Sequence, residues 1–296
     1  MTRSALALTL ALALTCSLAA CTPAPTRTNP EPPPAAPSPP VTSAPEPGTK
    51  QEIPTAPTGS PVTLKAYFDL GEKMQPVART VPFTTAVLRA SIEQLLKGPT
   101  AAETKAGIGT LIPKGTRLRG VSLTGGVATV DLSSQFSSGG GTLSMTNRLA
   151  QVVYTATQFR SVDAVLFKIE GKTVDVFGGE GILLEGPQTR GDFEDSTPAI
   201  LLDTPAWGDR VHRPLTAAGT ANVFEAVFRL QVLGAGGKVL LDTPVKASAG
   251  TGTRGTWSVV DAKALPAGAA RLRVFSDSPK DGSPTDVVEV PITIVQ

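Results

Sequence analysis

The side chains that could do chemistry in this sequence are few and widely spaced. His212 is the single histidine, and it stands beside Arg210 and Arg213 with no cysteine nearby. A lone histidine is a poor metal site, because zinc needs three or four ligands. No Ser-x-x-Lys or Gly-x-Ser-x-Gly pattern accompanies a nucleophile. His212 is therefore interpreted as a loop residue, although distant carboxylates could still converge in the fold to form an acid–base pair.

Two further clusters have both a ligand interpretation and a structural one. Gly139 to Gly141 lead toward a helix N-terminus, where backbone N–H groups could hold an anion, but the Gly-Lys-Ser/Thr of a phosphate loop is missing. Asp192, Glu194 and Asp195 lack the regular spacing of oxygen ligands that calcium needs. We favour a flexible connector for the glycines and a solvated hinge for the acids, and we expect no metal and no cofactor.

The two tryptophans, Trp207 and Trp257, leave one binding interpretation open. If exposed, they would form a platform for a sugar or a partner, with Trp207 as the contact residue. Tryptophan in a β-sandwich is more often part of the core. The exposure of the two indoles therefore decides between the interpretations.

Cys21 closes the first apolar stretch of the chain and predicts a covalent modification. Arg3 precedes a run from Ala5 to Ala20 of Ala, Leu, Ser and Thr, which indicates a secretory signal peptide. The run of about sixteen residues is short of the roughly twenty that span a bilayer. Its Leu-small-small-Cys ending resembles the lipobox of bacterial lipoproteins. The resemblance implies that Cys21 becomes the mature N-terminus and carries a diacylglycerol thioether and an acyl chain such as palmitate; the alternative is a secreted protein cleaved after Ala20.

Composition describes an exported chain with a long tether. Cys16 lies within the signal peptide, so the mature chain keeps Cys21 alone and forms no internal disulfide. Fourteen of the 27 prolines fall between residues 22 and 61, which favours extended polyproline II with a reach on the order of 100 Å. A Pro-rich ligand for a recognition module is the alternative. A net charge of +2 gives no long-range field for nucleic acid.

Residues 62–186 predict a mixed α and β block in which two helices cover one face of a small sheet. Leu88, Ile92 and Leu95 mark the buried stripe of the first helix, and Leu149 to Ala156 that of the second. The expected elements are strands over 62–68 and 77–81, a helix capped by Thr84 or Thr85 that runs to Lys97, a loop to Thr116, strands over 117–124 and 127–132 around Gly125-Gly126, a helix over 143–159, and strands over 163–169 and 173–177.

This block resembles the GerMN domain of sporulation and spore-germination proteins. The likeness is carried by IEQLLKGPT (92–100), LIPKGTRLRGVSLTGGVATVDLSSQF (111–136) and RLAQVVYTATQFRSVDAVLFKIEGK (148–172). It implies an α/β sandwich that acts in the cell envelope, often as a lipoprotein, with no known catalytic residues. Some relatives resemble ring-building modules, which implies self-association or docking.

Residues 199–296 predict an all-β sandwich. In the clearest strand, Phe224 to Leu233, alternation places Phe224, Ala226 and Phe228 on one face, with Val227 as the exception. Pro291 predicts that the last strand is an edge or carries a bulge. The expected strands are 199–202, 224–233, 239–241, 256–260, 271–275 and 287–295.

This second block resembles the Gmad2 domain, an immunoglobulin-like module found together with GerMN domains. AILLDTPAWGDRVHRPLTAAGTANVFEAVFRLQVL (199–233) carries the likeness. The fold class expected for the chain is α+β, with a small mixed α/β sandwich domain followed by an all-β immunoglobulin-like sandwich. The expected segments are a signal peptide over 1–20, a lipidated tether over 21–61, the GerMN-like domain over 62–186, a hinge over 187–198 and the Gmad2-like domain over 199–296.

The sequence as a whole favours an envelope protein that works by binding. We expect a lipid-anchored, extracytoplasmic, non-catalytic docking or assembly module, which contacts the membrane through its N-terminal lipid and binds another envelope protein or a second copy. The alternative is a lipoprotein that binds cell-wall glycan through Trp207. A wall-cleaving hydrolase would need a cleft with two close carboxylates.

Overall fold

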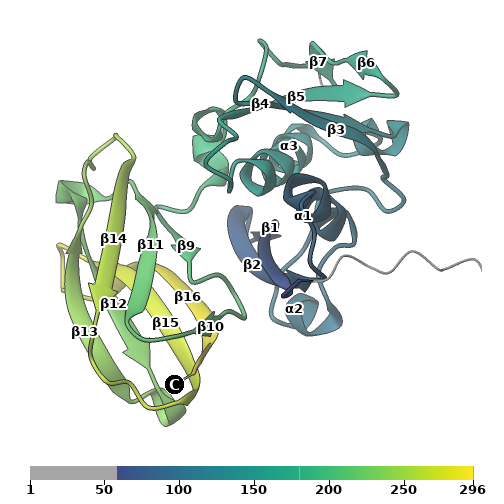
Figure 1. Cartoon of the computed structure of the whole chain (residues 1–296). Helices are drawn as coiled ribbons and strands as arrows, with labels where there is room; N and C mark the ends of the chain where they lie inside the picture. The colour runs from purple at the N-terminus through teal and green to yellow at the C-terminus, as the bar shows by residue number, and fades with distance from the viewer. Residues whose placement is uncertain (1–58, 180, 296) are drawn as a thin grey trace, which may run out of the picture. The chain divides into compact units, whose positions relative to one another are not determined.

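The structure is a computed structural model, and it describes residues 59–179 and 181–295. Figure 1 shows the helices and strands. The elements of the first block are β1 (Val62–Leu70), β2 (Lys73–Val81), α1 (Val87–Leu96), α2 (Ala101–Lys105), β3 (Leu118–Thr124), β4 (Val127–Leu132), the 3-10 turn η1 (Ser134–Ser137), α3 (Thr142–Ala156), β5 (Ala164–Ile169), β6 (Lys172–Thr173), β7 (Val176–Phe177) and β8 (Ile182–Leu183).

The first block contains a four-stranded sheet in the order β3-β4-β5-β6. The β3–β4 hairpin turns at Gly125 and Gly126, whose φ angles of 55° and 80° suit glycine, so the predicted hairpin is confirmed. β4 pairs with β5 in parallel, with Val127 opposite Ala164. A parallel pair needs a crossover, and α3 supplies it.

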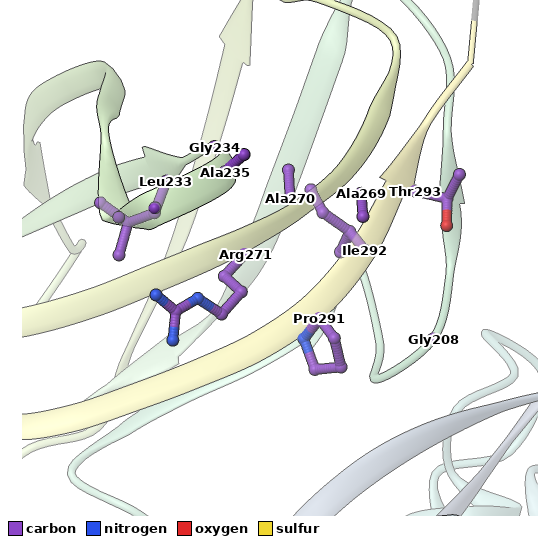
Figure 2. Close-up of a pocket in the computed structure, with 12 residues that line it drawn as sticks. Gly208, Leu233, Gly234, Ala235, Ala269, Ala270, Arg271, Pro291, Ile292 and Thr293 are labelled. Carbon is purple, nitrogen blue, oxygen red and sulfur yellow. The ribbon is translucent and has the colours of Figure 1, made fainter.

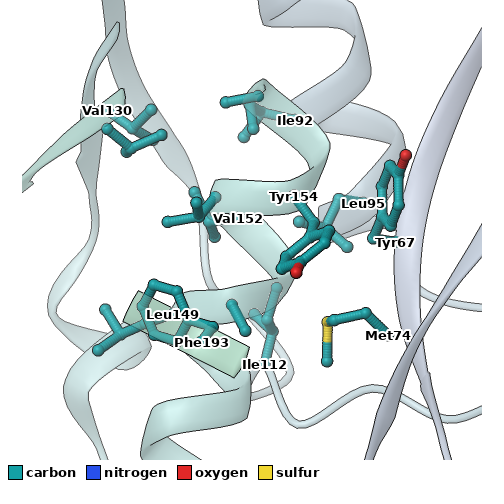
Figure 3. Close-up of a cluster of buried hydrophobic side chains, with 14 of the residues drawn as sticks. Tyr67, Met74, Ile92, Leu95, Ile112, Val130, Leu149, Val152, Tyr154 and Phe193 are labelled. Atoms are coloured by element: carbon teal, nitrogen blue, oxygen red, sulfur yellow. The ribbon is translucent and has the colours of Figure 1, made fainter. Parts of the chain in front are cut away.

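Helices α1 and α3 lie between the four-stranded sheet and a two-stranded ribbon made of β1 and β2 (Figure 1). Ile92 and Leu95 of α1 pack in one buried cluster with Val130 of β4 and with Leu149 and Val152 of α3 (Figure 3). The predicted buried stripe of α3, Leu149 to Ala156, is confirmed. Burial of this apolar surface is what holds the layers together.

Two local predictions for the first block are wrong. The segment expected to be a loop to Thr116 contains α2, because Thr100 and Glu103 form a capping box that starts a short helix. Helix α1 begins after Ala86, so neither Thr84 nor Thr85 is its cap; the Thr84 hydroxyl instead accepts a hydrogen bond from Ala86 N at 3.0 Å. Such caps depend on local backbone angles, which side-chain periodicity does not report.

The second block is a sandwich of a five-stranded sheet, β10-β16-β15-β12-β13, and a three-stranded sheet, β14-β11-β9. Leu230 and Leu272 from the larger sheet and Ile200, Ala217 and Trp257 from the smaller one share a core, which confirms the expected α+β fold class. The strands are β9 (Ile200–Thr204), β10 (Arg210–Val211), β11 (Leu215–Ala221), β12 (Val227–Leu233), β13 (Val239–Lys246), β14 (Gly255–Asp261), β15 (Gly268–Asp277) and β16 (Pro284–Ile294), with 3-10 turns η2 (Arg190–Ser196), η3 (Phe224–Ala226) and η4 (Ala235–Gly237).

Three predictions for the sandwich need correction. β11 was not predicted, because its Ala, Gly and Thr residues carry no apolar alternation, yet it is the central strand of its sheet. Phe224 does not continue the buried face of β12, since it lies in η3 and is exposed. For β16 the edge alternative is wrong, because β10 pairs with Thr293 and Ile294, but the bulge alternative is confirmed: between the pairs Val274–Val288 and Ser276–Thr285, β16 has one residue more than β15.

Polar side chains of α3, together with Gln158 just beyond it, replace a neighbouring strand along the outer edge of β1. Gln158 accepts from Lys65 N at 2.8 Å and donates to Lys65 O at 2.7 Å. Thr155 accepts from Tyr67 N at 3.0 Å, and Gln151 donates to Tyr67 O at 3.2 Å. We call these three side chains the α3 ladder. Buried backbone groups need partners, and this edge finds them on a helix.

The substitution Gln151→Leu tests the ladder. Leucine has a similar volume but cannot donate to Tyr67 O or accept from Leu111 N, which lies 2.9 Å from the Gln151 carbonyl oxygen. We expect the free energy of unfolding, measured by urea denaturation, to fall by about 2–4 kcal/mol, because each buried backbone group without a partner costs roughly 1–3 kcal/mol. The matched control is Gln135→Leu in exposed η1, and equal losses in the two variants would contradict the ladder.

Candidate functional site

The most perturbed ionisable groups gather where β1, η2 and β9 meet. Tyr67 donates a short hydrogen bond to Asp203 Oδ1. The guanidinium of Arg190 donates to Asp203 Oδ2 at 3.1 Å and to the Tyr67 hydroxyl at 3.2 Å. The same guanidinium lies 4.5 Å from the ring centroid of Tyr154. Lys65 reaches the Thr204 hydroxyl at 2.9 Å. We call these residues the junction cluster.

Burial explains the electrostatics of the junction cluster. Desolvation raises the pKa of Tyr67, and the negative charge of Asp203 raises it further. Desolvation also lowers the pKa of Lys65, although Asp203 opposes that effect. Perturbed pKa values mark candidate catalytic groups only where a substrate can reach them. Here the groups bond one another, and the cavities described below are lined by other residues. The cluster therefore acts as an internal clamp.

A second ion pair joins η2 to the sandwich. Arg254 donates to both carboxylate oxygens of Glu194, at 2.7 and 2.9 Å, and Asn222 donates to Glu194 at 3.0 Å. The hydrogen bonds from Arg254 lower the pKa of Glu194. Glu194 is thus bonded to the sandwich although its side chain is 42% exposed, and the hinge stays a prediction. Asp192 accepts from Thr189 within its own turn.

The residues singled out from the sequence do not converge. His212 is exposed on a loop, as predicted. Trp257 is 4% exposed and packs edge-on against Phe228. Trp207 is half-buried and packs against both cores, while its backbone N–H donates to Pro76 O at 3.0 Å. A glycan platform of two exposed indoles is therefore not supported. Cys21 lies outside the described residues.

The Gly139 to Gly141 loop is held in place by a buried arginine. Arg148 donates to Phe136 O at 2.6 Å and to Gly139 O at 3.0 Å. Burial lowers the pKa of Arg148. The loop was predicted to be a flexible connector, but the hydrogen bond from Arg148 to its Gly139 carbonyl fixes it to α3. Sequence reasoning missed the role because Arg148 follows the polar residues Thr146 and Asn147, a pattern typical of a solvated helix face.

No three His, Cys, Asp or Glu side chains gather in the described part of the chain as metal ligands would. Within residues 59–179 and 181–295, no helix is both long and apolar enough to cross a membrane.

An apolar groove runs beside β3, which is an edge strand of its sheet. The groove has a volume of about 410 Å³ and lies between β3, the start of α1 and Phe159. Leu123 on its rim is 42% exposed. Along the same strand, Arg119 is neutralised by Glu170 at 2.8 Å. The outer backbone edge of β3 pairs with no strand among the described residues. We call this surface the β3 groove.

A larger cavity lies at one end of the five-stranded sheet and has a volume of about 560 Å³. Figure 2 shows Leu233, Arg271 and Pro291 around it, at the end of β12 and on β15 and β16. The glycine-rich turn η4 and the small side chain of Ala269 complete its wall. We call this cavity the β12 pocket. It is open, mostly apolar, and has one cationic side chain.

Comparison with known families gives two matches. Residues 65–175 match the Germane family, described as sporulation and spore germination, and residues 199–283 match Gmad2, described as an immunoglobulin-like domain of bacterial spore germination. The chain carries a Germane (GerMN) domain followed by a Gmad2 domain. In this chain the β3 groove belongs to the Germane domain, and the β12 pocket adjoins strands of the Gmad2 sandwich. A comparison with curated proteins found no match.

Three solved structures are similar to parts of this chain. The first GerMN domain of the sporulation protein GerM from Bacillus subtilis is 22% identical with a TM-score of 0.36, over 44% of this chain and 98% of that one. The tandem GerMN domains of GerM are 20% identical with a TM-score of 0.37, over 62% and 59%. A proposed lipoprotein from Clostridium perfringens is 20% identical with a TM-score of 0.34, over 45% and 89%. Values this low say nothing of partners or ligands.

The substitution Asp203→Asn tests the clamp. It keeps the shape of the side chain but leaves the Arg190 guanidinium without a carboxylate, in a place where the two side chains are only 20% and 26% exposed. We expect urea denaturation to show a loss of about 2–4 kcal/mol in the free energy of unfolding, because an unpaired buried charge is costly.

Asp242→Asn is the matched control for this clamp variant. It breaks the ion pair with Arg229, in which the Asp242 side chain is 31% exposed and the Arg229 side chain 37% exposed. The free energy of unfolding should therefore fall by less than about 1 kcal/mol. If the two variants lost the same stability, the junction cluster would be an ordinary surface pair.

Proposed function

We propose that this chain is a lipid-anchored docking module of the cell envelope that binds a protein partner and does no catalysis. The observation that carries the proposal is the β3 groove. It combines an edge strand, whose outer backbone edge pairs with no strand among residues 59–179 and 181–295, with an apolar channel beside it. Such an edge accepts an added strand.

The β3 groove would bind an extended segment of another envelope protein. Backbone hydrogen bonds to β3 would set its direction, and an apolar side chain at every second position would enter the channel next to Leu123 and Phe159. Arg119 of the strand is paired with Glu170, and Arg89, which lines the groove, is paired with Glu93 at 3.4 Å, so neither arginine offers an unpaired charge. An uncharged, apolar segment therefore suits the groove better than an acidic or basic one.

A binding role is supported over catalysis by the state of the ionisable groups. Tyr67, Asp203 and Arg190 satisfy one another, and Glu194 is held by Arg254. Catalytic acids and bases need access to a substrate. The side chains named here instead form hydrogen bonds to one another within the protein.

Anchoring is supported by the sequence at the start of the chain. The lipobox-like ending at Cys21 supplies an acceptor for lipid, and two or more acyl chains hold a protein stably on a bilayer. The proline-rich residues 22–61 would then hold the two domains at a distance from the membrane.

The partner can be sought with a photo-crosslinking residue at Ser122 of the full-length chain in cells. Mass spectrometry should find a discrete adduct with one envelope protein. Adding Leu123→Arg should reduce that adduct about tenfold or more, because a charge placed in an apolar contact costs more than 1.4 kcal/mol. Leu183→Arg, on an exposed residue of β8, is the control and should leave the adduct unchanged. Glycan adducts alone, or equal loss in both variants, would overturn the docking role.

The anchor can be tested independently with Cys21→Ser. Removal of the thiol should release the chain from the membrane fraction, and mass spectrometry of the wild-type N-terminus should show the mass of a diacylglycerol and an acyl chain on Cys21. An unmodified N-terminus in the wild type, or full membrane retention of the variant, would rule out the lipid anchor.

A further inference from the structure

Phe224 is an exposed aromatic side chain on a turn that leads into β12. It is 71% exposed, and its neighbour Glu225 is exposed as well. The Glu225 carboxylate forms no hydrogen bond or ion pair within the described residues. Large exposed aromatics are typical of contact sites, where they supply most of the binding energy. We call Phe224 and Glu225 the η3 knob.

The backbone of the η3 knob is strained and firmly held. Glu225 and Ala226 have φ angles of 53° and 58°, in the left-handed region that non-glycine residues avoid. Glu225 N donates to the Thr251 hydroxyl at 3.0 Å, and Thr251 N donates to Val223 O at 2.9 Å. A Cβ on Gly250 would lie 2.4 Å from Val223 O, so the supporting loop needs glycine there. A strained backbone that is held by such contacts indicates that the conformation of the η3 knob has a function.

The β12 pocket lies at the opposite end of the same strand. The η3 knob precedes Val227, where β12 begins, and the pocket adjoins Leu233, where β12 ends. Seven residues of strand separate them by roughly 20 Å. The β12 pocket has a volume of about 560 Å³, which accommodates one phenyl ring with neighbouring backbone. One end of the sandwich thus presents a projection, and the other a recess.

The charges of the two ends are complementary. On the face of the sheet next to the β12 pocket, Arg229 is paired with Asp242 and Arg271 with Glu289, each at 2.7 Å. Arg273 lies on the same face, two residues along β15 from Arg271 of the pocket, and its neighbours in the strand register are Gln231 and Glu289, the carboxylate that is paired with Arg271. It has no carboxylate partner among the described residues, and its Nε is buried without a hydrogen-bond acceptor. Its guanidinium lies over the ring of Phe275, 4.8 Å from the ring centroid.

We propose that two copies of this chain bind head to tail, with the η3 knob of one copy in the β12 pocket of the next. Phe224 fills the apolar recess beside Leu233, and Glu225 supplies the carboxylate that Arg273 lacks. The knob and the pocket are different surfaces, so the contact is heterologous, and each bound copy still offers one free knob and one free pocket. The contact therefore builds open chains or rings, where a symmetric contact would stop at a dimer.

This inference rests on the proposed docking role but uses a surface of the Gmad2 domain that is separate from the β3 groove. Sedimentation velocity of the full-length chain in detergent tests it. Protein concentrations should extend to the order of 100 µM, because a contact of this small area is weak. The wild type should grow beyond a dimer as its concentration rises. Phe224→Ala, which removes the knob, and Ala269→Trp, which fills the pocket, should each stay monomeric.

The decisive sample is an equimolar mixture of the two variants. Phe224→Ala still has a pocket and Ala269→Trp still has a knob, so the mixture should form dimers and nothing larger. Val260→Ala removes an exposed apolar side chain of similar accessibility, 67% exposed on β14, and should assemble like the wild type. Unchanged thermal melting would show that each variant is folded, as expected for substitutions at exposed positions.

Three results would overturn the inference: a wild type that stays monomeric, a mixture that stays monomeric, or a Val260→Ala variant that loses assembly as Phe224→Ala does. The Ser122 crosslink separates the two proposals. If assembly fails while the Ser122 adduct persists, the docking role stands without head-to-tail binding. If the adduct is also absent, both are refuted.

Discussion

The outer edge of β1 is the constraint on which the first domain depends. A two-stranded ribbon is not stable alone, and a buried strand edge with unpaired backbone groups would cost several hydrogen bonds. The α3 ladder meets this need with side chains in place of a strand, through Gln151, Thr155 and Gln158. β1 is fixed in register against α3, and its last residues pair with Gly109. The ribbon therefore belongs to the domain without joining its main sheet.

The junction cluster follows from that registration. Tyr67 on β1 and Tyr154 on α3 lie with their ring centroids 5.5 Å apart, and the guanidinium of Arg190 lies over both rings. Arg190 is then aligned for Asp203 at the end of β9. If β1 slipped by one residue, Tyr67 would point to the other face of its ribbon and the cluster would lose its centre. The helix–strand contact thus determines the contact between η2 and β9.

Sequence patterns predicted the features that are marked by apolar spacing or by glycine pairs. Leu149 to Ala156 repeat at helical spacing, and Gly125-Gly126 mark a tight turn, so both features were found. The α3 ladder was not found, because Gln151 and Thr155 have the composition of a solvated helix face. Only the fold shows that this face meets a strand edge. Phe224 was placed in the core by alternation, and the two positive φ angles after it, which turn it outward, have no composition signal, because glycine is absent there.

The near-neutral charge of the chain determines how its surfaces can recognise partners. A formal net charge of +2 gives no long-range steering, and three arginines of the sheet faces, Arg119, Arg229 and Arg271, are already paired with carboxylates. Recognition at the β3 groove and at the β12 pocket must then come from short-range contacts: backbone pairing, one apolar side chain, one unpaired arginine. Contacts of this size are weak in dilute solution. A lipid anchor with a long tether would confine many copies to one surface and raise their effective concentration, and that is the setting in which such contacts suffice for assembly.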